Sequence, residues 1–211
     1  MKRDKDETRE VRMLAASELR VSRDGDNPPK ITGYAAVFNS LSDDLGWFRE
    51  KIKPGAFKNA LKNSDARALW NHDSNYVLGR ESAGTLELRE RTRGLWMENT
   101  PPDTQWARDL MLSIDRGDVK EQSFAFTVKR DKWESSENEG EPETRTIIEV
   151  REIFDVSPVT FPAYPDTTVA KRSKDVFNAA NRDEYTDEAN LVYENDNQEI
   201  DELEIELNMG E

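Results

Sequence analysis

The sequence predicts a mainly β protein of the α+β class. Short apolar runs alternate with turn signals from residue 13 onward, and Val, Ile, Phe, Tyr and Trp recur in the runs between Ile31 and Ile148, as is typical of strands. Two stretches have the apolar spacing of a helix instead. The 211 residues suffice for one domain of ordinary size with extensions at its ends.

Eight strands are expected from these runs, at residues 19–21, 31–38, 66–70, 85–89, 95–98, 123–129, 146–154 and 156–160. The segment 134–143 is acidic and has no apolar residue. We expect it to be an exposed hairpin loop between two strands, because such a segment has nothing to bury.

Two helices are expected between the strands. The first covers 54–62, because Pro54 suits a first helical position and apolar residues follow on one face. The second follows Pro102, with Asp103 as its cap and Gly117 at its end, and apolar residues recur in it every four positions. Both are expected to pack against a sheet.

Charge separates the end of the chain from its body. Residues 174–211 carry 13 acids and 2 bases, a net charge of −11, which leaves −3 for residues 1–173 out of the total of −14. We expect a disordered arm over 1–12, a folded domain over 13–173, and an acidic tail over 174–211 that is disordered or folds on a partner.

Composition excludes several classes of protein and site. A near-neutral body lacks the basic surface that nucleic-acid binding needs. The chain has no cysteine, which excludes disulfides, thiolate metal sites and cysteine nucleophiles, and its single histidine disfavours a histidine metal site. No signal peptide is expected at the first residues, and no run of about 18 apolar residues predicts a membrane span.

The single histidine, His72, follows an apolar run and precedes polar turn residues. This places it at the end of a strand, where side chains often reach a surface cleft. Imidazole titrates closest to neutral pH, so it suits proton transfer in the cell. Taken alone, such a histidine is more often a surface or half-buried residue.

Ser123 is distinguished by its setting at the start of a strand. Phe124, Phe126 and Val128 alternate onto one face, so Ser123 lies on the opposite face among small side chains. A nucleophile needs that room for a peptide to approach. A serine tolerated on the lighter face of a sheet is the ordinary alternative. No Gly-x-Ser-x-Gly motif is present, which excludes the α/β-hydrolase arrangement.

A serine hydroxyl needs a base that takes its proton, and a third group normally orients that base. With one histidine in the chain, we expect a carboxylate in the third role. Glu149, Glu152 and Asp155 are the candidates, because a hairpin across 134–143 would bring them beside Ser123. Glu149 and Asp155 share one strand face and Glu152 takes the other, but a β-bulge would remove that distinction.

Six short stretches follow one another in an order known from one family. They are Ile-Thr-Gly-Tyr-Ala-Ala-Val-Phe-Asn-Ser at 31–40, Glu-Lys-Ile-Lys-Pro-Gly-Ala-Phe at 50–57, Leu-Trp-Asn-His-Asp at 69–73, Leu-Gly-Arg at 78–80, Gln-Ser-Phe-Ala-Phe at 122–126, and Asp-Val-Ser-Pro-Val-Thr-Phe-Pro-Ala-Tyr-Pro at 155–165. In these stretches the chain resembles the tailed-phage prohead, or capsid maturation, serine proteases over about residues 13–173.

The resemblance implies a fold related to the herpesvirus assembly proteases, a closed or partly open β-barrel ringed by a few helices. It implies that Ser123 is the nucleophile and His72 the general base. Glu149 is the best match for the orienting acid, with Asp155 and Glu152 as alternatives. The family usually has glycine where this chain has Ala125.

The function implied by the resemblance is a serine endopeptidase acting through an acyl-enzyme. Its substrates would be the scaffold-like segment of the major capsid protein, the scaffold and the protease itself, inside the procapsid in the host cytoplasm. The portal is a further candidate partner, and self-association is expected. No cofactor, metal, nucleic acid or membrane is expected. Arg80 and Arg145 are candidates beside backbone amides for stabilising the oxyanion, although surface charge is the ordinary role for both.

Two other kinds of protein would fit parts of the sequence. One is a non-catalytic acidic scaffold or assembly protein on the same fold, although a scaffold needs neither Ser123 nor His72. The other is a β-barrel binding module in which the serine and histidine coincide by chance. Ser123→Ala distinguishes them, because a scaffold would still mature shells and a protease would leave the capsid protein uncut.

Overall fold

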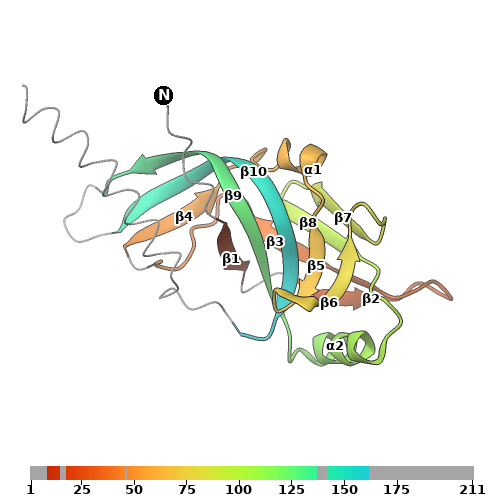
Figure 1. Cartoon of the computed structure of the whole chain (residues 1–211). Helices are drawn as coiled ribbons and strands as arrows, with labels where there is room; N and C mark the ends of the chain where they lie inside the picture. Colours follow the sequence, from red (N-terminus) through yellow and green to blue (C-terminus); the bar gives the residue numbers. More distant parts are fainter. Residues whose placement is uncertain (1–8, 15–17, 46, 137–141, 162–211) are drawn as a thin grey trace, which may run out of the picture. The chain divides into compact units, whose positions relative to one another are not determined.

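Two β-sheets form the body of the chain (Figure 1). The computed structural model describes residues 9–14, 18–45, 47–136 and 142–161. The first sheet has the strand order β1-β9-β10-β5-β6, with β4 also paired to β10, and the second has the order β2-β3-β8-β7. The elements are β1 (Glu10–Leu14), β2 (Arg20–Ser22), β3 (Lys30–Val37), β4 (Phe48–Ile52), α1 (Ala60–Asn63), β5 (Arg67–Trp70), β6 (Asp73–Arg80), β7 (Leu86–Glu90), β8 (Gly94–Asn99), α2 (Gln105–Arg116), β9 (Glu121–Glu134) and β10 (Glu143–Val159).

The long hairpin of β9 and β10 lies in the interior of the first sheet. These strands pair antiparallel from Glu121 with Val159 to Glu134 with Thr144, which confirms the expected hairpin around the acidic segment. The two strands expected over 146–154 and 156–160 are one strand, β10. Four register shifts interrupt its pairing with β9. Bulges therefore bend this hairpin and change which face each β10 side chain takes.

Apolar side chains of both sheets and both helices share one core. Phe124 and Phe126 of β9 stack with their ring centroids 4.6 Å apart, and Phe57 meets Phe124 edge-on at 5.9 Å. All three rings are at most 2% exposed. Full burial of a phenylalanine stabilises the fold by roughly 1.5–3 kcal/mol, so this cluster holds the Ser123 strand firmly in place.

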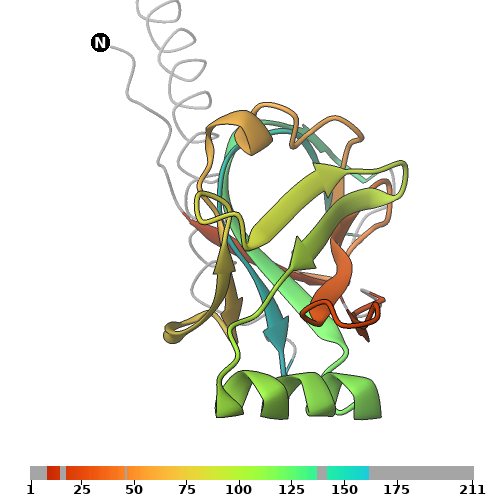
Figure 2. The same cartoon turned by 90° about the vertical axis from the view of Figure 1, so that its right-hand side faces the viewer.

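Helix α2 follows the sequence prediction closely, and α1 does not. Gly117 ends α2 in the left-handed conformation at φ 80°, although Thr104 rather than Asp103 takes the cap position. The first helix was expected over 54–62, but α1 covers only Ala60–Asn63. Gly55 has φ 89°, which no right-handed helix can accommodate. Figure 2 shows α2 across one end of the sheets, where it packs on β2.

The expected barrel is not closed in the part of the chain that the structure describes. Its strands form two separate sheets, joined by an isolated parallel bridge between Phe38 and Ile52. Strands β1, β4 and β6 were not predicted, because charged and polar residues dilute their apolar pattern. Residues 10–12 had been assigned to a disordered arm and belong to β1. The rest of the arm up to residue 8 and the acidic tail lie outside the described residues.

Candidate active site

Strand β9 carries Ser123 next to its first residues, between β10 and β1. Ser123 lies opposite Ser157 of β10 on one side and opposite Met13 of β1 on the other. Its side chain is on the strand face opposite Phe124, as the alternation predicted. The residue is only 1% exposed. The lighter face of β9 is therefore covered in this structure rather than open.

A tight turn between β5 and β6 carries His72. Asn71 and His72 are the two residues of this connection, with φ of 55° and 58°. Positive φ at both positions is typical of a type I′ hairpin turn, and Asn and His tolerate that conformation better than most residues. The backbone N–H of Asn71 donates to the carbonyl oxygen of Pro158 (3.0 Å), and the side-chain oxygen of Asn71 accepts from the backbone N–H of Thr160 (2.9 Å). These bonds fasten the turn to the end of β10.

The imidazole of His72 joins a serine and a carboxylate in one chain of hydrogen bonds. Its Nε2 lies 2.7 Å from Ser123 Oγ, and its Nδ1 lies 2.6 Å from Asp155 Oδ1. With Nδ1–H donating to the carboxylate, Nε2 is free to accept the serine proton. Ser123, His72 and Asp155 thus have the connectivity of a Ser–His–Asp triad, contributed by β9, the β5–β6 turn and β10.

Asp155 is held as an anion in a buried position. The residue is 1% exposed, and its carboxylate accepts hydrogen bonds from Ser157 Oγ (2.7 Å) and the Arg9 guanidinium as well as from His72. Burial raises the pKa of Asp155, but the hydrogen bonds and the charges of His72 and Arg9 lower it further, so the pKa is below its ordinary value. The carboxylate can therefore stabilise a protonated His72 at neutral pH.

The structure does not place Glu149, the best sequence match for the orienting acid, at His72. Its carboxylate accepts from Lys129 Nζ and Asn59 Nδ2, each at 2.8 Å, and these contacts lower its pKa. Glu152, the other alternative, is an exposed residue opposite Thr127. The register shifts along β10 explain this difference from the expected placement, because strict alternation cannot be carried across bulges.

The two arginines considered for the oxyanion are both engaged elsewhere. Arg80 pairs with Asp65 through its Nε at 2.7 Å. Arg145 is 6% exposed and lies in a cluster of charges with Glu10, Glu50 and Asp131. Neither is bonded to a residue of the triad.

Sequence reasoning missed three side chains at this site. Ser157 and Arg9 bind the Asp155 carboxylate, and Asn71 holds the His72 turn. The neighbouring Asn-His pair was a readable signal, since asparagine before a turn residue favours left-handed backbone. Nothing in the sequence pointed to Arg9, because its partner is 146 positions away.

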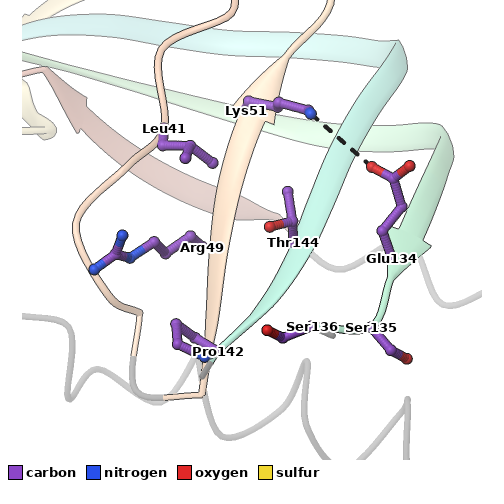
Figure 3. A pocket seen from close by; sticks show the side chains of 8 residues that line it. All are labelled: Leu41, Arg49, Lys51, Glu134, Ser135, Ser136, Pro142 and Thr144. Atoms are coloured by element: carbon purple, nitrogen blue, oxygen red, sulfur yellow. Dashed lines mark ion pairs between the residues drawn. The ribbon is translucent and has the colours of Figure 1, made fainter. Parts of the chain in front are cut away.

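A separate pocket lies at the far end of the β9–β10 hairpin (Figure 3). Polar and charged side chains dominate its lining, with Lys51 and Glu134 paired across it at 3.9 Å. No triad residue is among those that line it.

Comparison with known proteins places the chain in a family. Residues 17–182 match the model of the caudovirus prohead serine proteases. The chain belongs to this family. The prohead protease of Enterobacteria phage HK97 is 29% identical over 165 residues, which cover 76% of this chain and 68% of that protein. The resemblance inferred from the six sequence stretches is thereby confirmed.

A solved structure is also similar to this member of the prohead protease family. The bacteriophage T4 capsid assembly protease matches with a TM-score of 0.45 and 12% identity, covering 72% of this chain and 99% of that one. Among the described residues, neither helix has the length and apolar character needed to cross a membrane.

Proposed function

We propose that this chain is a serine endopeptidase of phage capsid maturation, with Ser123 as nucleophile, His72 as general base and Asp155 as the orienting acid. The observation that carries the proposal is the hydrogen-bonded chain from Ser123 Oγ through His72 to Asp155. Membership of the prohead protease family supports the same chemistry independently.

Ser123 Oγ attacks the carbonyl carbon of the substrate peptide bond while His72 Nε2 takes the hydroxyl proton. The protonated His72, stabilised by the Asp155 carboxylate, then gives that proton to the leaving amine as the C–N bond breaks. Water repeats the sequence on the acyl-enzyme: His72 takes its proton, the acid product leaves, and Ser123 Oγ is protonated again. Asp155 does not change its own protonation in this cycle.

The substrates in this proposal are the scaffold-like segment of the major capsid protein, the scaffold and the protease itself, cut inside the procapsid. Support comes from the family and from the HK97 relative, which is named a prohead protease. Capsid protein, scaffold and a second copy of this chain are its proposed partners, with the portal as a further candidate. Kinship with the herpesvirus assembly proteases through a partly open barrel is part of the same proposal.

Co-expression of the full chain with its capsid protein tests the function. We expect wild type to shorten the capsid protein at one site or a few, seen by mass spectrometry, and Ser123→Ala to leave it whole. Ser22→Ala is the matched control, because Ser22 is exposed on β2. Capsid protein cut equally by wild type and Ser123→Ala would refute the proposal, and shells that mature with the alanine variant would favour a scaffold instead.

A further inference from the structure

Strand β1 lies at the open edge of the sheet, directly beside the proposed nucleophile. It is the terminal strand in the order β1-β9-β10-β5-β6, and it pairs antiparallel with residues 122–126 of β9. Proteins often bind an extended peptide by adding it as one more strand to such an edge. A peptide added at this edge of β9 would pair beside Ser123, and β1 fills that position.

The backbone of β1 also contacts the hydroxyl of Ser123. Ser123 Oγ donates to the carbonyl oxygen of Arg12 at 2.9 Å, while His72 Nε2 lies 2.7 Å from the same Oγ. A hydroxyl has one proton, so its donation to Arg12 competes with its transfer to His72. The Arg12 carbonyl thus lies against Ser123 Oγ, on the side from which the carbonyl of a bond to be cut could approach.

The side chain of Arg12 enters a buried acidic site on the other face of the strand. Its Nε and one terminal nitrogen reach the two carboxylate oxygens of Glu50 at 2.8 and 3.0 Å, a bidentate pair. The Glu50 side chain is 3% exposed. Glu50 comes from β4, so it belongs to the body of the fold rather than to β1.

Charge at this site favours a cation in the place of Arg12. Without β1 the cluster would hold the carboxylates of Glu50 and Asp131 and the guanidinium of Arg145. One negative charge is then in excess. Strand β1 leaves this net charge unchanged, because it brings Glu10 together with Arg12, but it gives Glu50 a bidentate partner. A neutral or acidic side chain in that place would leave Glu50 buried with only part of its charge compensated, which is costly. A basic side chain in that place supplies Glu50 with its hydrogen-bond donors, and it also compensates the excess charge where the bound strand carries no acid at the position of Glu10.

A second contact of the same N-terminal segment reaches the triad. The Arg9 guanidinium binds the Asp155 carboxylate, the group that has to stabilise protonated His72. The segment that carries Arg9 and β1 precedes residue 17, where the match to the family begins. The occupant of the edge is therefore outside the matched part of the chain, whereas Glu50, Ser123 and Asp155 are inside it.

We propose that β1 occupies the substrate's place on β9, and that Glu50 selects a basic side chain at the residue before the bond to be cut. This inference rests on the proposed peptidase function. Substrate strands with Arg or Lys at that residue displace β1, pair with β9 and present their carbonyl to Ser123. Glu50 is the specificity residue, and β1 holds the enzyme in an inactive state until it is displaced.

The first test measures access to Ser123 in the full chain. A fluorophosphonate probe should label Arg12→Ala about tenfold faster than wild type, or more, because truncating one partner of a buried charge pair weakens docking of its strand by at least that factor. Arg20→Ala on β2 is the matched control and should label at the wild-type rate. Equal labelling of the two variants, with both shown folded by circular dichroism, would overturn the occupancy of the edge by β1.

The second test measures specificity with peptides that differ only at the residue before the cut, carrying Arg, Lys, Leu or Glu. For wild type and Arg12→Ala we expect kcat/KM about tenfold or more higher for Arg and Lys than for Leu, since an unpaired buried charge costs at least that factor. In Glu50→Gln the ratio of Arg to Leu should fall to within about twofold, whereas the exposed control Glu87→Gln should keep it.

The outcomes separate this inference from the proposed function. If Leu or Glu peptides are cut as well as Arg peptides, or if capsid protein is cut and no peptide is, the basic subsite is overturned and the peptidase stands. If neither capsid protein nor peptide is cut in a Ser123-dependent way, the peptidase proposal itself fails. The wild-type peptide panel decides the specificity even if Glu50→Gln does not fold.

Discussion

Replacing Asp155 by asparagine tests the proposed triad at the position where sequence and structure differ. The substitution keeps the shape of the side chain but removes the negative charge to which His72, Ser157 and Arg9 donate hydrogen bonds. An amide nitrogen facing His72 Nδ1 would stabilise the tautomer with its proton on Nε2. That tautomer cannot accept the proton of Ser123, whose Oγ lies 2.7 Å away.

The expected loss in turnover is about 10⁴-fold, the size typical of an orienting aspartate lost from a serine triad. This factor corresponds to about 5 kcal/mol of transition-state stabilisation. Glu149→Gln is the matched control, because it neutralises the carboxylate that the sequence favoured and that the structure places against Lys129 and Asn59. Its turnover should stay within about threefold of wild type, as for most changes outside a site.

The assay follows capsid-protein cleavage over time with the full chain, with Ser123→Ala as the lower limit of detection. Circular dichroism and urea unfolding verify that each variant is folded. If Asp155→Asn keeps turnover within about tenfold of wild type, or if Glu149→Gln is the more damaging change in a folded protein, the assignment of Asp155 is refuted.

Three further predictions concern stability and positioning. Because the pKa of Asp155 is lowered in the fold, its contribution to stability is complete above the ordinary aspartate value of about 3.9 and is lost as pH falls through the lower folded value. Urea unfolding measured from about pH 6 down to about pH 2 should therefore show a steeper loss of unfolding free energy for wild type than for Asp155→Asn. Equal slopes would contradict this prediction. Asn71→Gly keeps the left-handed turn but removes the side-chain hydrogen bonds of Asn71 to Thr160. Turnover should fall about tenfold, while the free energy of unfolding falls by about 1 kcal/mol. An unchanged turnover would show that these hydrogen bonds do not position His72. Gly94→Ala should lower the free energy of unfolding in urea by about 2 kcal/mol or more, because the added Cβ would lie 1.9 Å from the Ala36 carbonyl oxygen. An unchanged free energy of unfolding would mean that β3 and β8 can separate there.

The strand that carries Ser123 could be predicted from local pattern. The alternation of Phe124, Phe126 and Val128 is a property of neighbouring residues, and it predicts that Ser123 lies on the other face of the strand. The acidic loop and its hairpin were predictable for the same reason, since a ten-residue polar segment between two strand patterns has nothing to bury and forms an exposed connection. Family membership rested on short stretches that could be compared without any knowledge of the fold.

The acid of the triad could not be predicted in this way. Choosing among Glu149, Glu152 and Asp155 required the position of each carboxylate relative to His72, and the bulges of β10 change that position by whole residues. Strand β1 was missed for a related reason. Glu10 and Arg12 read as solvated charges, and they become buried only because Glu50 and Arg145 meet them from distant strands.

The sequence by itself determined which residues had the chemistry: one imidazole, a serine on the small-residue face of a strand, and a set of carboxylates on the following strand. Those properties depend on residue type and local periodicity, which are complete in the chain. Only the tertiary structure decided which carboxylate meets the imidazole and that an N-terminal strand covers the serine. Both depend on contacts between segments up to 146 positions apart, and no local pattern encodes such distances.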